Sequence, residues 1–327
     1  MKYIVLGKTG MTIPKVTLGC WAIGAGSEWG KSLEDSVYMA TMEKALDLGV
    51  NFFDTAQVYG AGHSEILVGN VIKDIRDKVV ISTKALAPDL TEDKCEKTVM
   101  QSLKRLQTDY IDIMFLHWPH PDIHIERNVE QLQKLKDKGM IRAIGLSNIT
   151  LKHMELASAV ADLDVIQPCY NLFWRHPEKE IFPYCIKNNI GVITYTSIAS
   201  GLLTGKFNKD TKFDPDDNRS YLLALFQPKI YEKAVDEVEK IKCISQKINK
   251  TVSQVVINWT MNRPGVTSAI VGAKTPAQTA ENAAAADFDL SVEDTTLLNE
   301  LGKEIIGLTA QWDTMYRKND DRLKIKY

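Results

Sequence analysis

Four residues whose side chains can transfer protons stand at or just after the ends of apolar runs. Asp54 ends the run VNFFD, and Tyr59 follows it by five residues. Lys84 ends the run VVISTK, and His117 ends the run IDIMFLH. Short runs rich in β-branched and aromatic residues predict buried strands. The sequence therefore predicts an Asp, a Tyr, a Lys and a His at or beside the ends of neighbouring strands.

These four side chains form a set suited to acid–base catalysis. A free tyrosine hydroxyl has a pKa of about 10, which is too high for proton transfer at neutral pH without help. A lysine ammonium near Tyr59 would lower that pKa by favouring the phenolate, and an aspartate would keep the lysine charged and oriented. A histidine could hydrogen-bond to a substrate oxygen and orient it.

Each of the four also has an ordinary structural interpretation when it is taken alone. Asp54 could cap a helix or form a structural salt bridge, and Tyr59 could pack in the core. His117 could be a satisfied core histidine. Lys84 could lie at the surface, although a lysine at the end of an apolar strand needs a partner. The occurrence of all four at strand ends favours the functional interpretation.

The elements that must position these residues alternate between strands and helices. A hairpin around the turn GKTG is predicted from residues 2–6 and 11–13. Strands are then predicted at 16–20, 50–54, 79–84, 110–117, 141–147, 164–168, 190–196 and 266–271. Helices are predicted at 34–48, 64–75, 91–106 with Thr91 as its N-cap, 126–138, 150–161, 177–188, 230–249 and 252–262.

Eight apolar strands that alternate with helices predict a parallel sheet covered on both faces. An open doubly wound sheet and a closed (β/α)8 TIM barrel both fit that alternation. The strand count favours the barrel, and so do the polar residues that follow strands all round rather than at one switch point. No strand is followed by G-x-G-x-x-G, so a Rossmann dinucleotide site is not predicted.

The composition argues against several classes of function. The 327 residues are 44% hydrophobic and 25% charged with a net charge of −2, which gives no reason to expect a nucleic-acid or anionic-membrane partner. No apolar run approaches the ~20 residues that span a bilayer, and MKYIVLGK lacks the apolar region of a signal peptide. The five cysteines are scattered without a C-x-x-C pair, so we expect no disulfide framework, no metal site and a cytoplasmic protein.

The motifs DTAQVYG, STK and FLHWP, in this order and at these separations, resemble the Asp-Tyr-Lys-His tetrad of the aldo-keto reductase family. The resemblance extends from residue 6 to residue 282. The segment WAIGAGSEWG resembles the bacterial branch of the family most. The potassium-channel β-subunit-like members of the family are similar too. It implies one TIM-barrel domain over residues 1–327. The hairpin would be a lid on the bottom of the barrel, and a C-terminal tail, 306–327, could fold over its mouth. A monomer is the family's common state.

The resemblance also implies a nicotinamide cofactor. Side chains that match Ser147, Asn148 and Gln167 hold the nicotinamide carboxamide in the family, and the one that matches Tyr195 stacks on the ring. A primary amide needs donors and acceptors, and these side chains supply both; Ser147 and Asn148 could also cap the following helix. The implied cofactor-binding residues are Trp21, Ser147, Asn148, Gln167, Tyr195, Thr196, Ser197, Ile198, Ala199, Gly201, Leu202, Lys206, Gly272, Lys274, Thr275, Gln278, Glu281 and Asn282.

Two segments near the C-terminal strands suit phosphate groups. SIASGLLTGK (197–206) resembles the family's pyrophosphate segment; it is not a Walker A loop, because Phe207 follows the lysine. GAKTPAQTAEN (272–282) opens a helix whose N-terminal amides could bind a phosphate. Lys274 and Gln278 match positions that grip the adenosine 2′-phosphate. Gln278 stands where many members have arginine, which weakens the argument for NADP(H) over NAD(H). Lys274 remains to grip the extra phosphate, so we expect NADP(H) first and NAD(H) as the alternative.

Four tryptophans are predicted to line the substrate pocket, and they are Trp21, Trp29, Trp118 and Trp174. Parts of 207–228 and 306–327, including Trp312, Tyr316, Arg317 and Arg322, are expected to complete the walls. The polar stretch 207–221 is typical of a lid or binding loop. Such walls suit an apolar or sugar-like carbonyl compound without defining which one.

Three hypotheses follow. The first is an NADP(H)-dependent reductase of an aldehyde, ketone or sugar carbonyl in which Tyr59 is the general acid or base. The second is a cofactor-binding, redox-sensing regulatory subunit with slow turnover. The third is a barrel enzyme that uses Lys84 as a Schiff-base nucleophile, which would leave Tyr59 and Asp54 without a clear purpose.

Overall fold

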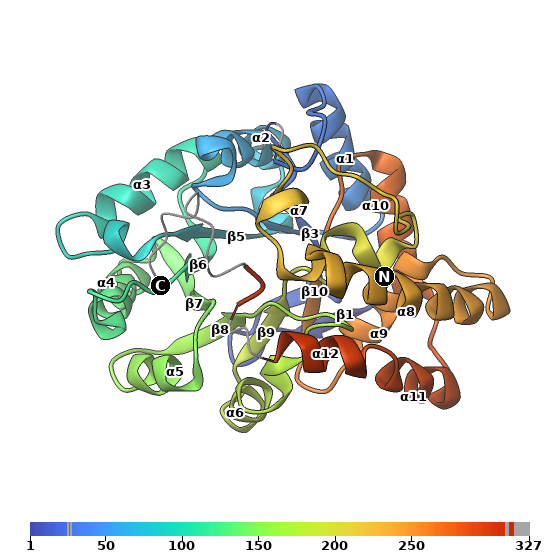
Figure 1. Cartoon of the computed structure of the whole chain (residues 1–327). Helices are drawn as coiled ribbons and strands as arrows, with labels where there is room; N and C mark the ends of the chain where they lie inside the picture. The colour runs from blue at the N-terminus through green and yellow to red at the C-terminus, as the bar shows by residue number, and fades with distance from the viewer. Residues whose placement is uncertain (25, 27, 311–313, 317–327) are drawn as a thin grey trace.

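Parallel strands form a closed barrel at the centre of the computed structural model, which describes residues 1–24, 26, 28–310 and 314–316. Among these residues eight strands close in the order β10-β3-β4-β5-β6-β7-β8-β9, with helices around them (Figure 1). The barrel strands are β3 (Val16–Gly19), β4 (Phe52–Asp54), β5 (Val80–Ala85), β6 (Ile111–Leu116), β7 (Ile141–Ser147), β8 (Leu163–Gln167), β9 (Gly191–Thr194) and β10 (Ser268–Gly272). The prediction of a (β/α)8 TIM barrel is confirmed.

The helices follow the strands in alternation, as the sequence predicts. They are α1 (Asp35–Asp47), α2 (His63–Ile72), α3 (Cys95–Leu106), α4 (Ile125–Asp137), α5 (Leu151–Ser158), α6 (Ile181–Lys187), α7 (Asn218–Tyr221), α8 (Pro228–Lys247), α9 (Val252–Met261), α10 (Pro276–Ala283), α11 (Val292–Glu300) and α12 (Lys303–Thr309). Two short 3-10 segments, η1 (Tyr59–Gly62) and η5 (Ala199–Thr204), lie in the loops that leave β4 and β9.

The barrel strands are apolar on both faces because both faces are buried. Every residue of β5 and β6 is buried, which explains why their apolar residues occur on both faces rather than at alternate positions. An inner cluster fills the barrel and contains Phe52, Ile113, Phe115, Val165 and Ile193. A second, larger cluster packs the outer faces of the strands against the helices. Together the two layers hold the strand ends in fixed positions.

The N-terminal hairpin covers the bottom of the barrel, as expected. Its strands β1 (Tyr3–Val5) and β2 (Thr12–Pro14) pair antiparallel. Leu6 and Ile13 belong to the inner barrel cluster. A Cβ atom on Gly7 would lie 2.4 Å from the backbone nitrogen of Gly191, the first residue of β9. The hairpin therefore closes the end of the barrel opposite the C-terminal ends of the strands.

Several predicted boundaries are wrong, such as the start of the helix predicted at 177–188, which begins at Ile181. Helix α3 begins at Cys95 rather than near Thr91, and Thr91 belongs to the turn that precedes it. The segment expected to form a tail from residue 306 begins inside helix α12, which packs against α8 through apolar side chains such as Ile305. Trp312, Arg317 and Arg322, which were expected to contribute to the pocket walls, lie outside the described residues.

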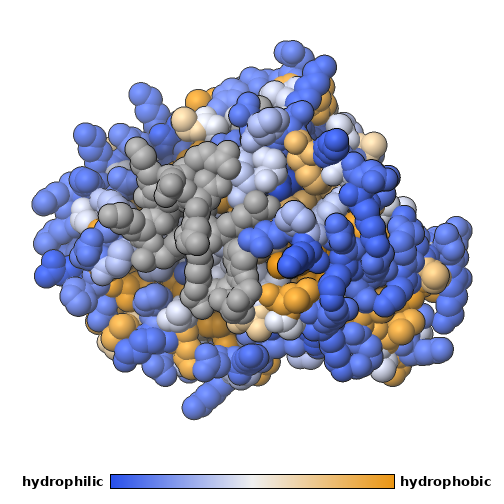
Figure 2. All heavy atoms as spheres, viewed as in Figure 1, coloured by the Kyte–Doolittle hydropathy of each residue, from blue (hydrophilic) through white to orange (hydrophobic). Residues whose placement is uncertain are grey.

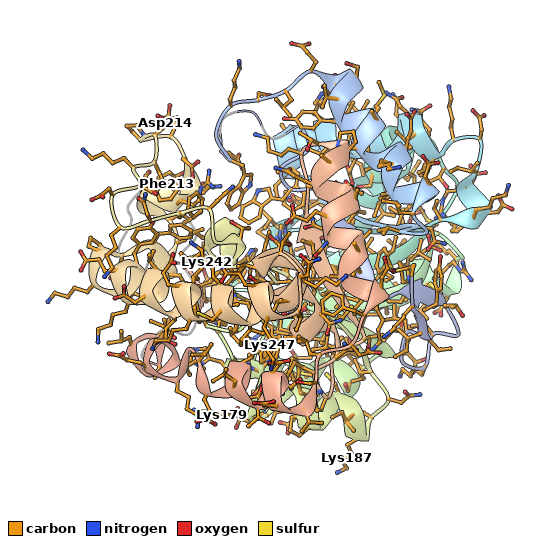
Figure 3. The ribbon with its side chains drawn as sticks, turned by 90° about the vertical axis from the view of Figure 1, so that its right-hand side faces the viewer. Lys179, Lys187, Phe213, Asp214, Lys242 and Lys247 are labelled. Carbon is orange, nitrogen blue, oxygen red and sulfur yellow. The ribbon has the colours of Figure 1, made fainter. Side chains whose placement is uncertain are left out.

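Figure 2 shows hydrophilic side chains over much of one face, with apolar ones in smaller groups. Phe213 packs against Phe207 and Phe226, and Figure 3 shows it beside Asp214 on a loop near α8, the helix that carries the labelled Lys242 and Lys247. None of the described helices combines the length and the hydropathy that crossing a bilayer requires. The described residues also contain no His, Cys, Asp and Glu cluster that could hold a metal.

Candidate active site

A cavity of about 810 Å³ opens at the C-terminal ends of the barrel strands. Its volume falls within the roughly 300–1,000 Å³ typical of small-molecule and cofactor sites. The residues that end or follow the eight strands line it, and they are Gly19, Asp54, Leu86, His117, Ser147, Gln167, Tyr195 and Gly272. This is the end of a TIM barrel where active sites occur.

The predicted acid–base residues meet at the base of this cavity. The Lys84 ammonium donates to the Asp54 carboxylate at 2.7 Å and to the Tyr59 hydroxyl at 3.2 Å. Lys84 is 0% exposed, and Asp54 is 3% exposed. A buried lysine and a buried aspartate compensate each other only when they pair closely. The His117 ring meets the Tyr59 ring edge-on, with 5.9 Å between the ring centroids.

Asp54 is held by more than its lysine partner. Its Oδ1 atom accepts from the Ser82 hydroxyl at 2.6 Å and from the Gln167 amide at 2.8 Å. Ser82 lies two residues before Lys84 on β5, so both side chains point to the same face of the strand. The sequence analysis missed Ser82, although this spacing could have indicated it. Three donors on one buried carboxylate satisfy its charge and fix its orientation.

Close backbone packing positions Tyr59. Gly60 follows it with φ +54, and a Cβ atom there would lie 2.1 Å from the Gly24 carbonyl oxygen. The loop after β4 can therefore approach the loop after β3 only because residue 60 is a glycine. Trp21, from that second loop, stacks on the Tyr59 ring with centroids 5.7 Å apart and an interplanar angle of 14°. These contacts leave the Tyr59 hydroxyl between Lys84 and the cavity.

The expected lowering of the Tyr59 pKa is wrong for this structure. Burial, together with the negative charge of Asp54, raises the pKa of Tyr59 well above its ordinary value. The Lys84 ammonium beside the Tyr59 hydroxyl is itself paired with Asp54, and burial lowers the pKa of Lys84 while that carboxylate raises it. Tyr59 is consequently held as the neutral phenol at neutral pH, the form that can donate a proton.

His117 is held in its neutral form. Burial, followed by the positive charge of Lys84, lowers the pKa of His117 well below its ordinary value. Its Nδ1 atom is buried without a hydrogen-bond partner among the described residues. A neutral imidazole carries one N–H donor. His117 can thus offer a hydrogen bond to a substrate oxygen without carrying charge.

The amide-binding residues expected at the ends of β7 and β8 form one connected group. The Tyr195 hydroxyl donates to Asn148 Oδ1 at 2.5 Å, and Asn148 Nδ2 donates to Ser147 Oγ at 3.0 Å. Ser147 Oγ donates in turn to the Gln167 carbonyl oxygen at 2.9 Å. All four line the cavity. The alternative role as a helix cap belongs instead to Thr150, which caps α5.

The loop after β9 carries an unusual backbone. Thr196, Ala199 and Ser200 have φ values of 57, 48 and 55, and Gly201 follows with φ 93. Non-glycine residues rarely adopt this left-handed region, and it concentrates at binding sites. Thr196, Ser200 and Gly201 line the cavity with Ser197, Ile198 and Lys206, whereas Ala199 and Leu202 are buried and do not.

A group of basic side chains lies at this part of the cavity. Burial lowers the pKa of Lys206, and the nearby charges of Arg219 and Lys274 lower it further. Arg219 also pairs with Asp217. Clustered cations of this kind suit a polyanion such as a dinucleotide diphosphate. Arg219 was not predicted individually, although it lies in the long polar stretch 207–221 that was expected to act as a lid or binding loop.

The segment after β10 lies against the loop after β3. The Lys274 ammonium donates to the backbone carbonyl oxygens of Trp29 and Lys31. Gln278 Oε1 accepts from the Lys274 backbone amide at 2.8 Å. These contacts place Lys274 at the rim of the cavity. The other residues expected here also line it, and they are Gly272, Thr275, Gln278, Glu281 and Asn282.

Three of the four predicted pocket tryptophans are in place. Trp21, Trp29 and Trp118 line the cavity, and Tyr316 packs edge-on against Trp118 with centroids 5.4 Å apart. Trp174 does not line it, so this prediction is wrong. It is 2% exposed and packs in the core, where it forms a backbone bridge with Asn171. The turn at Asn171 directs the tryptophan inward.

Glu28 is a further cavity residue that the sequence analysis did not single out. Its carboxylate accepts from the Trp21 indole N–H at 3.2 Å and from the side chain of Asn218. The Asn218 backbone amide also donates to the Glu28 carbonyl oxygen at 3.1 Å. Only the fold brings these two residues together, because they are far apart along the chain.

Comparisons with known proteins agree with this geometry. A family model described as "Aldo/keto reductase family" matches residues 15–303. The chain is 36% identical to "Aldo-keto reductase YhdN" of Bacillus subtilis (strain 168), over 92% of this chain and 93% of that protein. It is 33% identical to the "NADH-specific methylglyoxal reductase" of Escherichia coli (strain K12), over 93% and 99%. It is also 33% identical to a "Probable voltage-gated potassium channel subunit beta" of Arabidopsis thaliana, over 88% and 92%.

Solved structures are similar as well. The glycerol dehydrogenase AKR11B4 from Gluconobacter oxydans superposes with a TM-score of 0.84 at 33% identity, over 93% of this chain and 96% of that one. An aldo/keto reductase from Klebsiella pneumoniae in complex with NADP and acetate has a TM-score of 0.75 at 28% identity, over 92% and 95%.

Proposed function

The chain belongs to the aldo/keto reductase family, and on that premise we propose that it reduces a carbonyl compound to the alcohol, or catalyses the reverse reaction, with a nicotinamide cofactor. The observation that carries the proposal is the contact of the buried Lys84 ammonium with both Asp54 and Tyr59 at the base of the cavity. The resemblance to a structure in complex with NADP supports NADP(H) as the cofactor. The resemblance to an "NADH-specific" reductase supports NAD(H) as the alternative.

The cavity fits such a cofactor. The hydrogen-bonded side chains of Ser147, Asn148 and Gln167 suit a carboxamide, which needs both donors and acceptors. Tyr195 offers a ring beside them for stacking. Lys206 and Arg219 supply positive charge for a diphosphate. The cofactor would supply the hydride.

The chain's own residues would handle the proton and the substrate oxygen. Tyr59 donates its hydroxyl proton to the oxygen that becomes the alcohol. Lys84 hydrogen-bonds to the Tyr59 oxygen and, with Asp54 as its counter-ion, stabilises negative charge as the proton leaves. His117, held neutral by burial, donates a hydrogen bond that orients the carbonyl oxygen. Trp21, Trp29 and Trp118 form the walls around the substrate.

The resemblance to channel subunits supports a second candidate, a cofactor-binding regulatory subunit with slow turnover. The Schiff-base alternative has little support, because Lys84 is 0% exposed and its ammonium already donates to three oxygen atoms.

Cofactor oxidation at 340 nm with methylglyoxal, D-glyceraldehyde and dihydroxyacetone tests the first two candidates. Steady turnover of at least one carbonyl is expected. Cofactor binding without turnover of any carbonyl would favour the regulatory subunit.

A further inference from the structure

Glu28 places a carboxylate in the cavity wall close to the acid–base residues. Its Oε2 atom lies 3.2 Å from the Trp21 indole nitrogen. The Trp21 ring stacks directly on the Tyr59 ring. Both Glu28 and Tyr59 line the same cavity. The charge of Glu28 also contributes to the raised pKa of Tyr59. Glu28 therefore acts electrostatically on the position where a substrate carbonyl would meet Tyr59.

Within the described part of the chain, no salt bridge cancels the negative charge of Glu28. Its two side-chain partners, Trp21 and Asn218, are neutral N–H donors. Among the described residues no Lys, Arg or His forms an ion pair with Glu28. Burial raises its pKa, and the two hydrogen bonds oppose that shift because they stabilise the ionised form.

Among the described residues, the other charged side chains of the cavity form no ion pair with Glu28, and the Lys274 ammonium donates instead to the backbone carbonyl oxygens of Trp29 and Lys31. Asp54 and Lys84 form a buried pair beneath Tyr59. Arg219 pairs with Asp217, and its positive charge acts on Lys206. The described residues around the carbonyl position are otherwise apolar, aromatic or neutral, and they are Trp21, Val58, Leu86, His117, Trp118 and Tyr316. A substrate carboxylate at that end would therefore face Glu28, a carboxylate without an ion-pair partner among the described residues.

We propose that Glu28 is a specificity-determining residue that selects substrates by charge, so that the site accepts neutral carbonyl compounds and rejects those with a carboxylate or phosphate near the carbonyl. Like charges placed close together in a partly buried site cost binding free energy. Selection of this kind works by repelling the wrong ligand rather than by binding the right one more tightly. The inference rests on the proposed function, because it assumes that the carbonyl compound binds beside Tyr59.

Two aldehydes of matched shape test this inference. 4-Carboxybenzaldehyde carries an anionic carboxylate where 4-formylbenzamide carries a neutral amide. Calorimetric titration of the full chain with each aldehyde, in the presence of excess NADP⁺, measures binding without requiring reduction. We expect the wild type to bind the amide about tenfold more tightly than the carboxylate.

The variant Glu28→Gln removes the charge while its side-chain carbonyl can still accept from Trp21. We expect this variant to bind the two aldehydes with dissociation constants within about twofold of each other, mainly because the carboxylate binds more tightly. Glu92→Gln is the matched control, since it makes the same change in net charge at an exposed residue outside the cavity lining. It should keep the wild-type ratio.

Several results would overturn the inference. They are equal affinities in the wild type, an unchanged ratio in Glu28→Gln, an equal change in Glu92→Gln, and no binding of either aldehyde. A parallel assay with NADPH separates this inference from the proposed function. A charge preference in binding without any reduction would contradict the proposed function alone. Reduction with no charge preference would contradict the role of Glu28 alone.

Discussion

The Lys84 ammonium lies 3.2 Å from the Tyr59 hydroxyl oxygen, and Lys84 is fully buried beneath that tyrosine. Its other two donated hydrogen bonds go to Asp54 Oδ2 at 2.7 Å and to the Thr55 carbonyl oxygen at 2.8 Å. An ammonium has three N–H donors, so all of them are used. Lys84 can therefore act on a substrate only through Tyr59, and it is a positioning residue.

Replacing Lys84 with methionine should destabilise the fold as well as the chemistry. The change leaves the buried Asp54 carboxylate without its cation, although Ser82 and Gln167 still donate to it. Removal of one partner of a buried pair costs about 3–5 kcal/mol. Urea unfolding of Lys84→Met measures this loss. The double variant Lys84→Met, Asp54→Asn should recover part of it, and a loss below about 1 kcal/mol in the single variant would contradict the role of the pair.

The pH dependence of carbonyl reduction follows from the two shifted groups. Tyr59 has a raised pKa, so its acid form is present below that value and is lost only above the ordinary phenol pKa of about 10. His117 has a lowered pKa, so it stays neutral as the pH falls through the usual histidine value of about 6.5. We expect kcat/KM to be flat from about pH 6 to pH 9. A limb with an apparent pKa near 6.5 would contradict this, provided that Tyr59 and His117 variants confirm its origin.

Two tryptophans should respond differently to substitution. Trp118 lines the cavity beside Tyr316, so Trp118→Ala should raise KM by about tenfold while kcat changes less. Trp174 is a core residue, so Trp174→Phe should lower the free energy of unfolding by about 1–3 kcal/mol and leave KM unchanged. Steady-state kinetics and urea unfolding measure both effects. A raised KM in Trp174→Phe would return this residue to the substrate pocket.

Lys274 tests the choice between the two nicotinamide cofactors. As the proposed contact for the 2′-phosphate, it should contribute to NADPH binding and not to NADH binding. We expect Lys274→Met to raise the Kd of NADPH by about tenfold and to leave that of NADH within twofold. Quenching of tryptophan fluorescence follows both titrations. Equal weakening would mean that Lys274 serves mainly to hold the loop at Trp29 and Lys31 through their carbonyl oxygens.

The sequence predicts the barrel and the strand ends well, for a physical reason. Strands buried on both faces carry apolar residues on both faces, as at the start of β5 and through most of β6, and a polar residue at the end of such a run stands out. The carboxyl ends of parallel strands meet at one end of a barrel. The arrangement of Asp54 and Lys84 on neighbouring strands follows directly from those two facts.

Other features depend on how loops fold, which local patterns do not determine. Trp174 follows a turn at Asn171 that directs it into the core. Glu28 in the loop after β3 and Asn218 at the start of α7 are far apart along the chain, so their contact requires the closed barrel. The net shift of the Tyr59 pKa could not be predicted either. Its direction is set by burial first and then by the negative charge of Asp54, and the depth of burial depends on the folded structure.

The kinetics of Tyr59→Phe test the proposed mechanism most directly. Phenylalanine keeps the ring that stacks on Trp21 and removes only the hydroxyl that contacts Lys84. With a carbonyl substrate that the wild type reduces, kcat should fall by about 10²–10⁴-fold, the usual contribution of a general acid. The Kd of NADPH, measured by fluorescence titration, should stay within about twofold of the wild type, because the phenylalanine ring still stacks on Trp21. Retention of wild-type kcat in Tyr59→Phe would contradict the assignment of Tyr59 as the proton donor.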